Sequence, residues 1–199
     1  MSNKKPLLIV VSAPSGAGKS TLCDKLLAEY SDIVYSVSCT TRAPRGAERD
    51  GIDYNFMTEE EFNARVADGD FLEHATVHGN SYGTLRETVS SAMQSGNSVM
   101  MDIDVQGAAQ VRDALSRMDQ DSPLVRGFVD IFIMPPSVEE LRRRLIARGE
   151  DAPGVIETRL ANAEDEISQA GLYKYRIVND ELDKAFAELR AIIEQEAEL

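Results

Sequence analysis

The chain has 199 residues, enough for one well-buried core with insertions but too few for two large independent domains. It carries 34 acidic and 21 basic side chains, and its formal net charge of −13 excludes a protein whose whole surface attracts nucleic acid or anionic lipid. Hydrophobic residues make up 43% of the chain, yet no segment approaches the ~18 apolar residues of a membrane span, so neither a nucleic-acid nor a membrane partner is expected.

Short apolar runs alternate with amphipathic stretches, which predicts an α/β fold with a largely parallel sheet flanked by helices. A buried strand over residues 7–11 leads through a tight loop into a helix over residues 19–30. A capping box formed by Thr58 and Glu61 begins a helix over residues 59–67. Strands over residues 99–103 and 128–134 are followed by helices over residues 105–115 and 138–147. A last strand over residues 175–178 precedes a closing helix, whose apolar stripe comprises Leu182, Phe186, Leu189, Ile192 and Ile193.

Two polar stretches, residues 40–56 and 148–155, interrupt this alternation. They are rich in Gly, Pro and charged side chains, a composition typical of solvated loops. In isolation, each therefore predicts an exposed connection.

The motif SAPSGAGKST occupies residues 12–21, between the first predicted strand and the first helix. This is the context of a phosphate-binding P-loop, with Ala13 where the usual pattern has glycine. Backbone N–H groups and a helix N-terminus cradle polyphosphate oxygens in such a loop, while Lys19 reaches the β- and γ-phosphates and the Ser20 hydroxyl binds Mg²⁺. The predicted ATP-binding residues of this loop are Ala13, Pro14, Ser15, Gly16, Ala17, Gly18, Lys19, Ser20 and Thr21.

Asp102 and Asp104 follow a predicted central strand, at the end where α/β sheets present groups to their ligands. Beside a P-loop, a carboxylate there can hold the water shell of Mg²⁺, and we assign Asp102 to the metal through water. Acidic residues that end a strand are also common caps. How the two carboxylates divide between Mg²⁺ and the second substrate stays open.

Arg42 and Arg45 lie three residues apart and are followed by Glu48 and Tyr54. Paired guanidiniums suit a doubly charged phosphate because each donates hydrogen bonds in a planar fork. In an acidic chain that already contains a P-loop, this pair predicts a second phosphate site.

The chain resembles the guanylate kinases from about residue 6 to residue 187. The resemblance rests on SAPSGAGKST, SVSCTTRAPRGAERDGIDYNF, FLEHATVHGNSYGT, DIDVQG, LRRRLIARG and IVND, in that order. It implies Mg²⁺-assisted transfer of phosphate from ATP to GMP or dGMP, in purine metabolism and GMP recycling. It also implies a core of residues 1–36, 91–137 and 170–199, a GMP-binding insertion of residues 37–90 and a lid of residues 138–169.

The same resemblance implies a GMP site made of Ser38, Arg42, Arg45, Glu48, Tyr54, Glu73, Tyr82, Thr84 and Asp104. Arg42, Arg45, Tyr54 and Tyr82 would hold the phosphate, and Ser38 and Thr84 would complete recognition of the base. Glu73 has a physical logic of its own, because guanine offers N1–H and N2–H donors on one edge whereas adenine would leave the carboxylate unpaired.

Arg144, Arg148 and Arg159 occupy lid positions in the family, and with Lys19 and Arg42 they form the implied catalytic set. Cations there would stabilise the charge that spreads over the transferring phosphoryl group. Asn179 resembles the family position beside adenine, although capping of the last helix explains it about as well.

Two alternatives stay open from the sequence: a protein-binding module of the same fold without catalysis, and a kinase of a phosphorylated ribose. The complete set of Lys19, Ser20 and lid arginines weighs against the first, and Glu73 weighs against the second. With Cys23 and Cys39 as its only cysteines, the chain is expected to be cytoplasmic. The sequence leaves monomer and homo-oligomer undecided.

Overall fold

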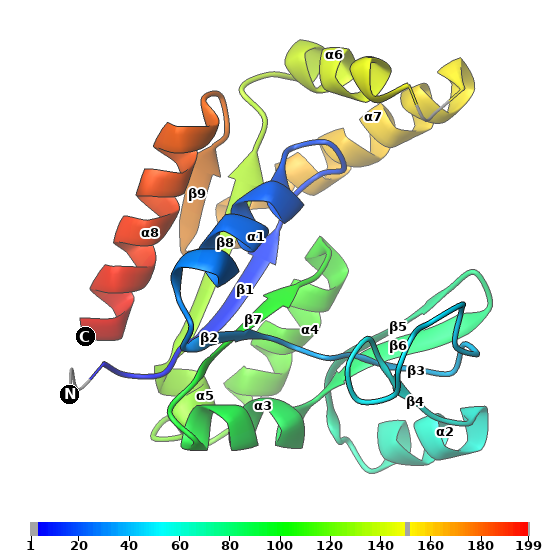
Figure 1. Cartoon of the computed structure of the whole chain (residues 1–199), viewed down its shortest axis with the longest axis vertical. Coiled ribbons are helices and arrows are strands. Elements are labelled where there is room, and N and C mark those ends of the chain that lie inside the picture. The colour runs from blue at the N-terminus through cyan, green and yellow to red at the C-terminus, as the bar shows by residue number, and fades with distance from the viewer. Residues whose placement is uncertain (1–3, 150–151, 199) are drawn as a thin grey trace.

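The computed structural model describes residues 4–149 and 152–198. Its centre is a five-stranded sheet in the order β2-β7-β1-β8-β9, and every pairing in it is parallel (Figure 1). The strands are β1 (Leu8–Ser12), β2 (Ile33–Tyr35), β7 (Ser98–Asp102), β8 (Phe128–Met134) and β9 (Tyr175–Val178). The predicted α/β fold is confirmed.

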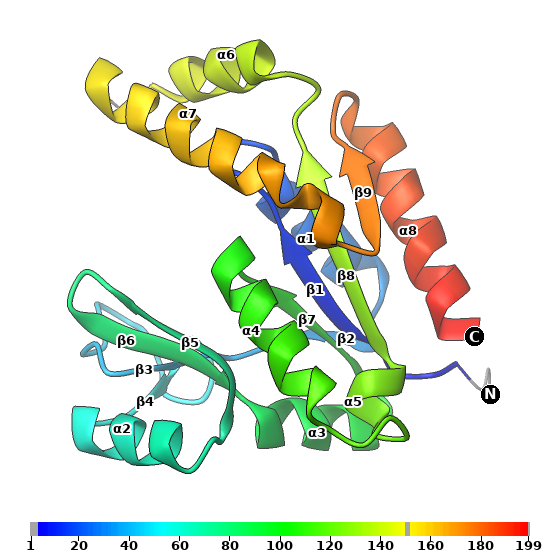
Figure 2. The ribbon, with the colours of Figure 1, turned by 180° about the vertical axis from the view of Figure 1, so that it is seen from behind.

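Helices cover both faces of this sheet, which explains why its strands are mainly apolar. The helices α1 (Lys19–Glu29) and α8 (Leu182–Glu198) pack on one face. The other face, turned to the viewer in Figure 2, carries α3 (Arg86–Gln94), α4 (Val105–Ser116) and α5 (Pro123–Arg126). Along β1, Ile9 and Val11 join the apolar cluster of the first face, and Leu8 and Val10 join that of the second.

A second, smaller sheet lies beside α4 and has the order β4-β3-β6-β5. Its strands are β3 (Cys39–Thr40), β4 (Asn55–Phe56), β5 (Phe71–Val77) and β6 (Asn80–Leu85). The helix α2 (Glu59–Ala67) packs on it, and Cys39, Phe62 and Phe71 form an apolar cluster separate from the main core. The small sheet therefore has an apolar cluster of its own, and Leu72 of β5 joins it to the main core.

A pair of helices, α6 (Val138–Arg148) and α7 (Pro153–Ser168), lies across the carboxyl ends of the central strands (Figure 1). Leu141 and Leu145 of α6 pack against Ile156, Leu160 and Ala163 of α7 in another separate cluster. A short 3₁₀ turn, η1 (Ala170–Leu172), connects α7 to the last strand of the sheet. The loop before α1 lies against this pair, since a Cβ at Gly16 would be 3.0 Å from the side chains of Leu141 and Leu145.

The predicted helices and strands agree with the structure to within one or two residues, but both predicted loops need correction. The stretch over residues 40–56 is not simply an exposed connection: it begins in β3 and ends in β4, and Thr40 and Arg42 are buried because β3 pairs with β4 and β6. The strands over 128–134 and 175–178 and the helix over 59–67 are confirmed, whereas the first strand is one residue later than predicted. The loop predicted over residues 148–155 is too long, because α6 continues to Arg148 and α7 begins at Pro153, a residue preorganised for a first helical turn. Residues 150 and 151 of that stretch lie outside the described part. No helix among the described residues combines the length and apolar character needed to cross a membrane.

Candidate functional site

The loop between β1 and α1 is shaped to receive an anion. Its last residue, Gly18, is the N-cap of α1 and provides no side chain to accept hydrogen bonds from the first turn of the helix. The first-turn N–H groups of α1 and the positive end of its dipole are therefore directed at the space in front of the loop. The loop bounds an open pocket of about 640 Å³.

Glycine is required at Gly18 for two reasons. Its φ of +90° is a conformation that side chains other than glycine rarely adopt. A Cβ there would also lie 2.3 Å from Nδ2 of Asn179, which donates a 2.8 Å hydrogen bond to the Ala17 carbonyl. Asn179 is 5% exposed and is directed at the loop rather than at α8, which begins at Leu182, so the capping explanation of this residue is wrong.

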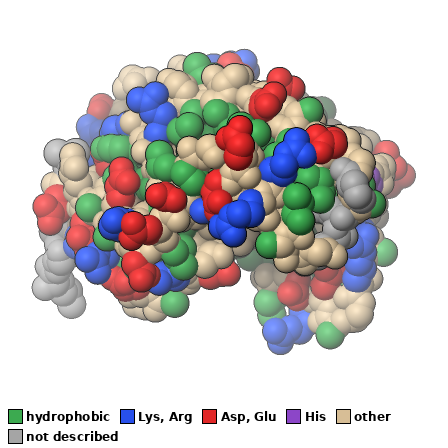
Figure 3. All heavy atoms as spheres, turned by 90° about the horizontal axis from the view of Figure 1, so that it is seen from above, with side chains coloured by type: hydrophobic (Ala, Val, Ile, Leu, Met, Phe, Trp, Pro, Cys, Tyr) green, Lys and Arg blue, Asp and Glu red, His purple; other side chains and the backbone are tan. Residues whose placement is uncertain are grey.

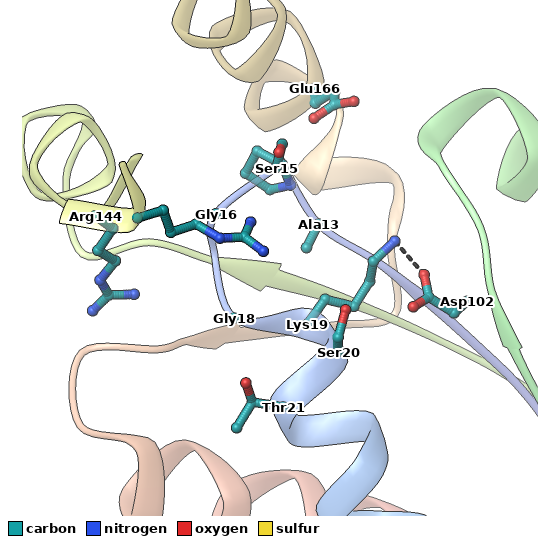
Figure 4. Close-up of a pocket in the computed structure, with 12 residues that line it drawn as sticks. Ala13, Ser15, Gly16, Gly18, Lys19, Ser20, Thr21, Asp102, Arg144 and Glu166 are labelled. Carbon is teal, nitrogen blue, oxygen red and sulfur yellow. Dashed lines mark ion pairs between the residues drawn. The ribbon is translucent and has the colours of Figure 1, made fainter. Parts of the chain in front are cut away.

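Lys19 forms an ion pair with Asp102 at the end of β7, the contact marked in Figure 4. Its Nζ also lies 3.5 Å from the Ile103 carbonyl oxygen. Ser20 lines the same pocket, one residue further along α1. In this arrangement the ammonium of Lys19 neutralises Asp102, and a phosphate group that enters the loop competes with Asp102 for it.

The far wall of the pocket comes from α6 and α7, and its basic side chains belong to α6. Arg144 and Arg148 line it, and Arg159 Nη1 donates a 3.0 Å hydrogen bond to Ser15 Oγ in the loop. Arg144 Nε donates to Glu140 at 2.9 Å and its Nη2 to the Asn179 carbonyl at 2.9 Å. The guanidiniums of Arg143 and Arg144 lower the pKa of Glu140 to about 2. Figure 3 shows acidic and basic side chains intermixed on the outer face seen from above.

On the small sheet, Arg42 is held in a fixed orientation by Glu48. Arg42 Nη1 and Nη2 donate to the two carboxylate oxygens at 3.0 and 2.9 Å, and the Arg45 backbone N–H donates to Glu48 at 2.7 Å. The Arg42 guanidinium holds the pKa of Glu48 below its usual range. Tyr54 lies beside this pair, with its ring 5.3 Å from Arg42 Cζ and 6.0 Å from the ring of Tyr82.

Glu73 belongs to a second group of side chains on the same sheet. It pairs in register with Thr84, and Tyr82 lies two residues before Thr84 on the same face of β6. Glu73 is 8% exposed, and burial raises the pKa of its carboxyl group, with the charge of Asp104 adding to the rise and hydrogen bonding from Thr84 opposing it. Asp104 caps α4 by accepting a 2.8 Å hydrogen bond from the Gly107 N–H. A buried carboxylate beside the start of α4 offers acceptors for a ligand with paired donors.

The structure thus divides the predicted residues into separate groups. One group surrounds the pocket or contacts its loop, and it comprises the loop residues, Lys19, Ser20, Asp102, Arg144, Arg148, Arg159 and Asn179. Arg42, Glu48, Tyr54 and Tyr82 adjoin one another on the small sheet, Glu73, Thr84 and Asp104 lie together, Ser38 is half-buried, and Arg45 is exposed.

Two acidic residues near the pocket were not predicted from the sequence as site residues. Glu166 of α7 lines the pocket, and Glu140 of α6 holds Arg144. Both sit on amphipathic helices, where charged positions read alike whether they face solvent or a ligand. No sequence signal marked either of them as a neighbour of the pocket.

Comparisons with known proteins agree on one family. A family model described as guanylate kinase matches residues 5–196. A guanylate kinase of Clostridium perfringens (strain SM101 / Type A) is 44% identical over 191 residues, 96% of this chain and 84% of that one. A guanylate kinase of Alkalilimnicola ehrlichii is 48% identical over 185 residues, 93% and 86% of the two chains. The crystal structure of guanylate kinase from Anaplasma phagocytophilum is similar with a TM-score of 0.69 and 36% identity, over 98% of this chain and 87% of that one.

Proposed function

The chain belongs to the guanylate kinase family, and from this premise we propose that it binds ATP at the loop of residues 13–21 and GMP on the small sheet. It is an enzyme that phosphorylates GMP with ATP. The observation that carries the placement of GMP is the buried carboxylate of Glu73, whose acceptors suit the N1–H and N2–H donors of guanine. A protein-binding module without catalysis and a kinase of a phosphorylated ribose are not favoured.

In the proposed GMP site, different side chains bind the two ends of the nucleotide, the phosphate and the base. Arg42, Arg45, Tyr54 and Tyr82 bind the phosphate, and Glu48 aligns Arg42 for this task through its two hydrogen bonds. Glu73, Ser38, Thr84 and Asp104 bind the guanine, with Glu73 as the main acceptor. The same contacts admit dGMP as an acceptor.

In the proposed ATP site, Lys19 leaves Asp102 and binds the β- and γ-phosphates, while loop N–H groups hold the remaining oxygens and Asn179 lies on the adenine side. An oxygen of the GMP phosphate attacks the γ-phosphorus in line, the bond to the β-phosphate oxygen breaks, and ADP leaves. The attacking phosphate is already an anion, so no residue has to act as a base. Arg144, Arg148 and Arg159 stabilise the charge on the transferring group.

The residues at the loop fit a magnesium ion bound with ATP. Mg²⁺ in kinases takes one or two protein oxygens beside phosphate oxygens and water, and the Ser20 hydroxyl and Asp102 carboxylate line the same pocket. Among the described residues, no group of three or more Asp, Glu, His and Cys side chains could hold a metal ion. Such an ion neutralises charge on the β- and γ-phosphates. Ser20 would bind it directly and Asp102 through water.

The separate apolar clusters support a division into moving parts. The small sheet with α2 and the pair α6–α7 each bury an apolar cluster of their own, so each can shift largely as a unit. Leu72 of β5 and Ile167 of α7 also pack against the main core, and these two contacts mark where each part would pivot. We propose a lid of residues 138–169 and a GMP-binding insertion of residues 37–85, on a core of the remaining residues. The insertion ends before α3 because the boundary after residue 90 would cut through that helix. Closure of both parts would exclude water from the transfer.

The test is release of ADP from Mg-ATP by the purified protein, with GMP, dGMP, AMP, UMP or a phosphorylated ribose as acceptor. Turnover confined to guanine nucleotides is expected, and equal turnover with AMP would contradict the role of Glu73. A cytoplasmic location and a task in recycling GMP within purine metabolism belong to the same proposal.

A further inference from the structure

Glu166 is an acidic side chain in a pocket that otherwise favours anions. It lies on α7 above the loop, as Figure 4 shows, and lines the same pocket as Lys19, Arg144 and Arg148. The other carboxylate in that lining, Asp102, is paired with Lys19. Among the residues that the structure describes, none forms a hydrogen bond or an ion pair with the Glu166 carboxylate.

This placement is unfavourable for the protein by itself. Glu166 is half-buried, and burial raises the pKa of its carboxyl group, with the charge of Asp104 as the next cause and Lys19 opposing the rise. A partly desolvated, unpaired carboxylate destabilises the fold. It also repels any polyphosphate held by the loop, because both carry negative charge at the same pocket. A neutral side chain at this position would relieve both effects.

We propose that Glu166 selects the charge state of the nucleotide: it disfavours metal-free ATP and leaves the binding of ATP complexed with a divalent cation nearly unchanged. This inference rests on the proposed placement of ATP at the loop. A metal-free triphosphate carries more negative charge than its magnesium complex, so a fixed carboxylate nearby costs the free form more. The selection is useful because metal-free ATP blocks the loop without supporting transfer.

Asp102 cannot provide the same discrimination alone. In the structure its charge is neutralised by Lys19, and it becomes unpaired only when Lys19 turns to the phosphates. None of the described residues neutralises Glu166 in this way, so its charge acts on the nucleotide from the moment of entry. It also belongs to α7, within the proposed lid, so its repulsion of a metal-free triphosphate would grow as the lid closes.

The experiment compares Glu166→Gln with Glu164→Gln, which removes the same charge from an exposed position of the same helix. Isothermal titration calorimetry measures binding of a non-hydrolysable ATP analogue to each variant and to the unmodified protein, first in EDTA and then with saturating Mg²⁺. For Glu166→Gln we expect about fivefold to tenfold tighter binding of the metal-free analogue and at most about twofold change with Mg²⁺. The gain should shrink at high salt, and Glu164→Gln should match the unmodified protein in both conditions.

Equal changes with and without Mg²⁺ would overturn the inference, and weaker binding in both conditions would make Glu166 a residue that orients the lid arginines instead. A thermal unfolding curve checks the fold, and Glu166→Gln should unfold at the same or a higher temperature because the charge of a half-buried carboxylate is removed. If the unmodified protein bound no ATP analogue in either condition, the proposed function itself would fail. The two failures are therefore distinguishable.

Discussion

Replacing Glu73 by Gln tests how the small sheet recognises guanine. The change keeps the size of the side chain but exchanges one carboxylate acceptor for an NH₂ donor, which would face a donor of the base. One charge-assisted hydrogen bond is lost and one donor of guanine is left unpaired in a site where Glu73 is 8% exposed. Together these effects are worth about 2–3 kcal/mol, or about 30-fold to 150-fold in kcat/KM for GMP.

The assay is ADP release at varied GMP with saturating Mg-ATP, combined with calorimetric binding of an ATP analogue. Binding of the ATP analogue should change by less than about twofold, because Glu73 lies outside the loop pocket. Glu60→Gln, an exposed position on α2 of the same segment, is the matched control and should leave both values unchanged. Equal losses for GMP and ATP would refute the reasoning.

The stability of this variant gives a second check with a defined sign. Burial raises the pKa of Glu73, so the folded state favours the protonated form, and the cost of the buried carboxylate appears as the pH rises through that raised pKa. At neutral pH, Glu73→Gln removes this cost and should not lower the melting temperature. A marked decrease would mean that the carboxylate holds the sheet together rather than the base.

Four further predictions follow from the same geometry. Lys19→Ala should abolish turnover while calorimetry still detects GMP binding, because the two nucleotides occupy separate places; simultaneous loss of GMP binding would contradict that separation. Gly18→Ala should weaken ATP-analogue binding by at least tenfold, because a Cβ would lie 2.3 Å from the Asn179 amide and φ is +90°. The value of kcat/KM for GMP should fall on acidification, and because the pKa of Glu73 is raised, the fall should begin at a higher pH than an ordinary glutamate of pKa ~4.3 would cause. In Glu73→Gln the part of the pH dependence that is due to Glu73 should be missing, and the part that is due to titration of the GMP phosphate should remain. Leu145→Ala should destabilise the α6–α7 pair by about 2–5 kcal/mol, seen as faster amide hydrogen exchange in those helices than in the central sheet; equal acceleration in the sheet would show that the pair has no separate stability.

Much of the fold was readable from local pattern. The buried strand before residue 12, the glycine-rich loop and the amphipathic helix after it are consecutive in the chain, so spacing alone placed Lys19 and Ser20 at a helix N-terminus. The small sheet was different, because β3 and β4 have two residues each and owe their pairing to distant partners. Strands that short carry no periodicity, and the sequence therefore read residues 40–56 as a loop.

The chain itself determined which chemical groups are available: a phosphate loop, paired arginines, a carboxylate for guanine and a basic helix face. The tertiary structure decided which of these side chains contact one another. It pairs Lys19 with Asp102, orients Arg42 through Glu48, directs Asn179 at the loop and leaves Glu166 unpaired among the described residues that surround the pocket. Contacts such as Lys19–Asp102 and Ala17–Asn179 join residues more than 80 positions apart. Only the packing of the whole chain brings such residues within hydrogen-bond distance, and local pattern carries no information about it.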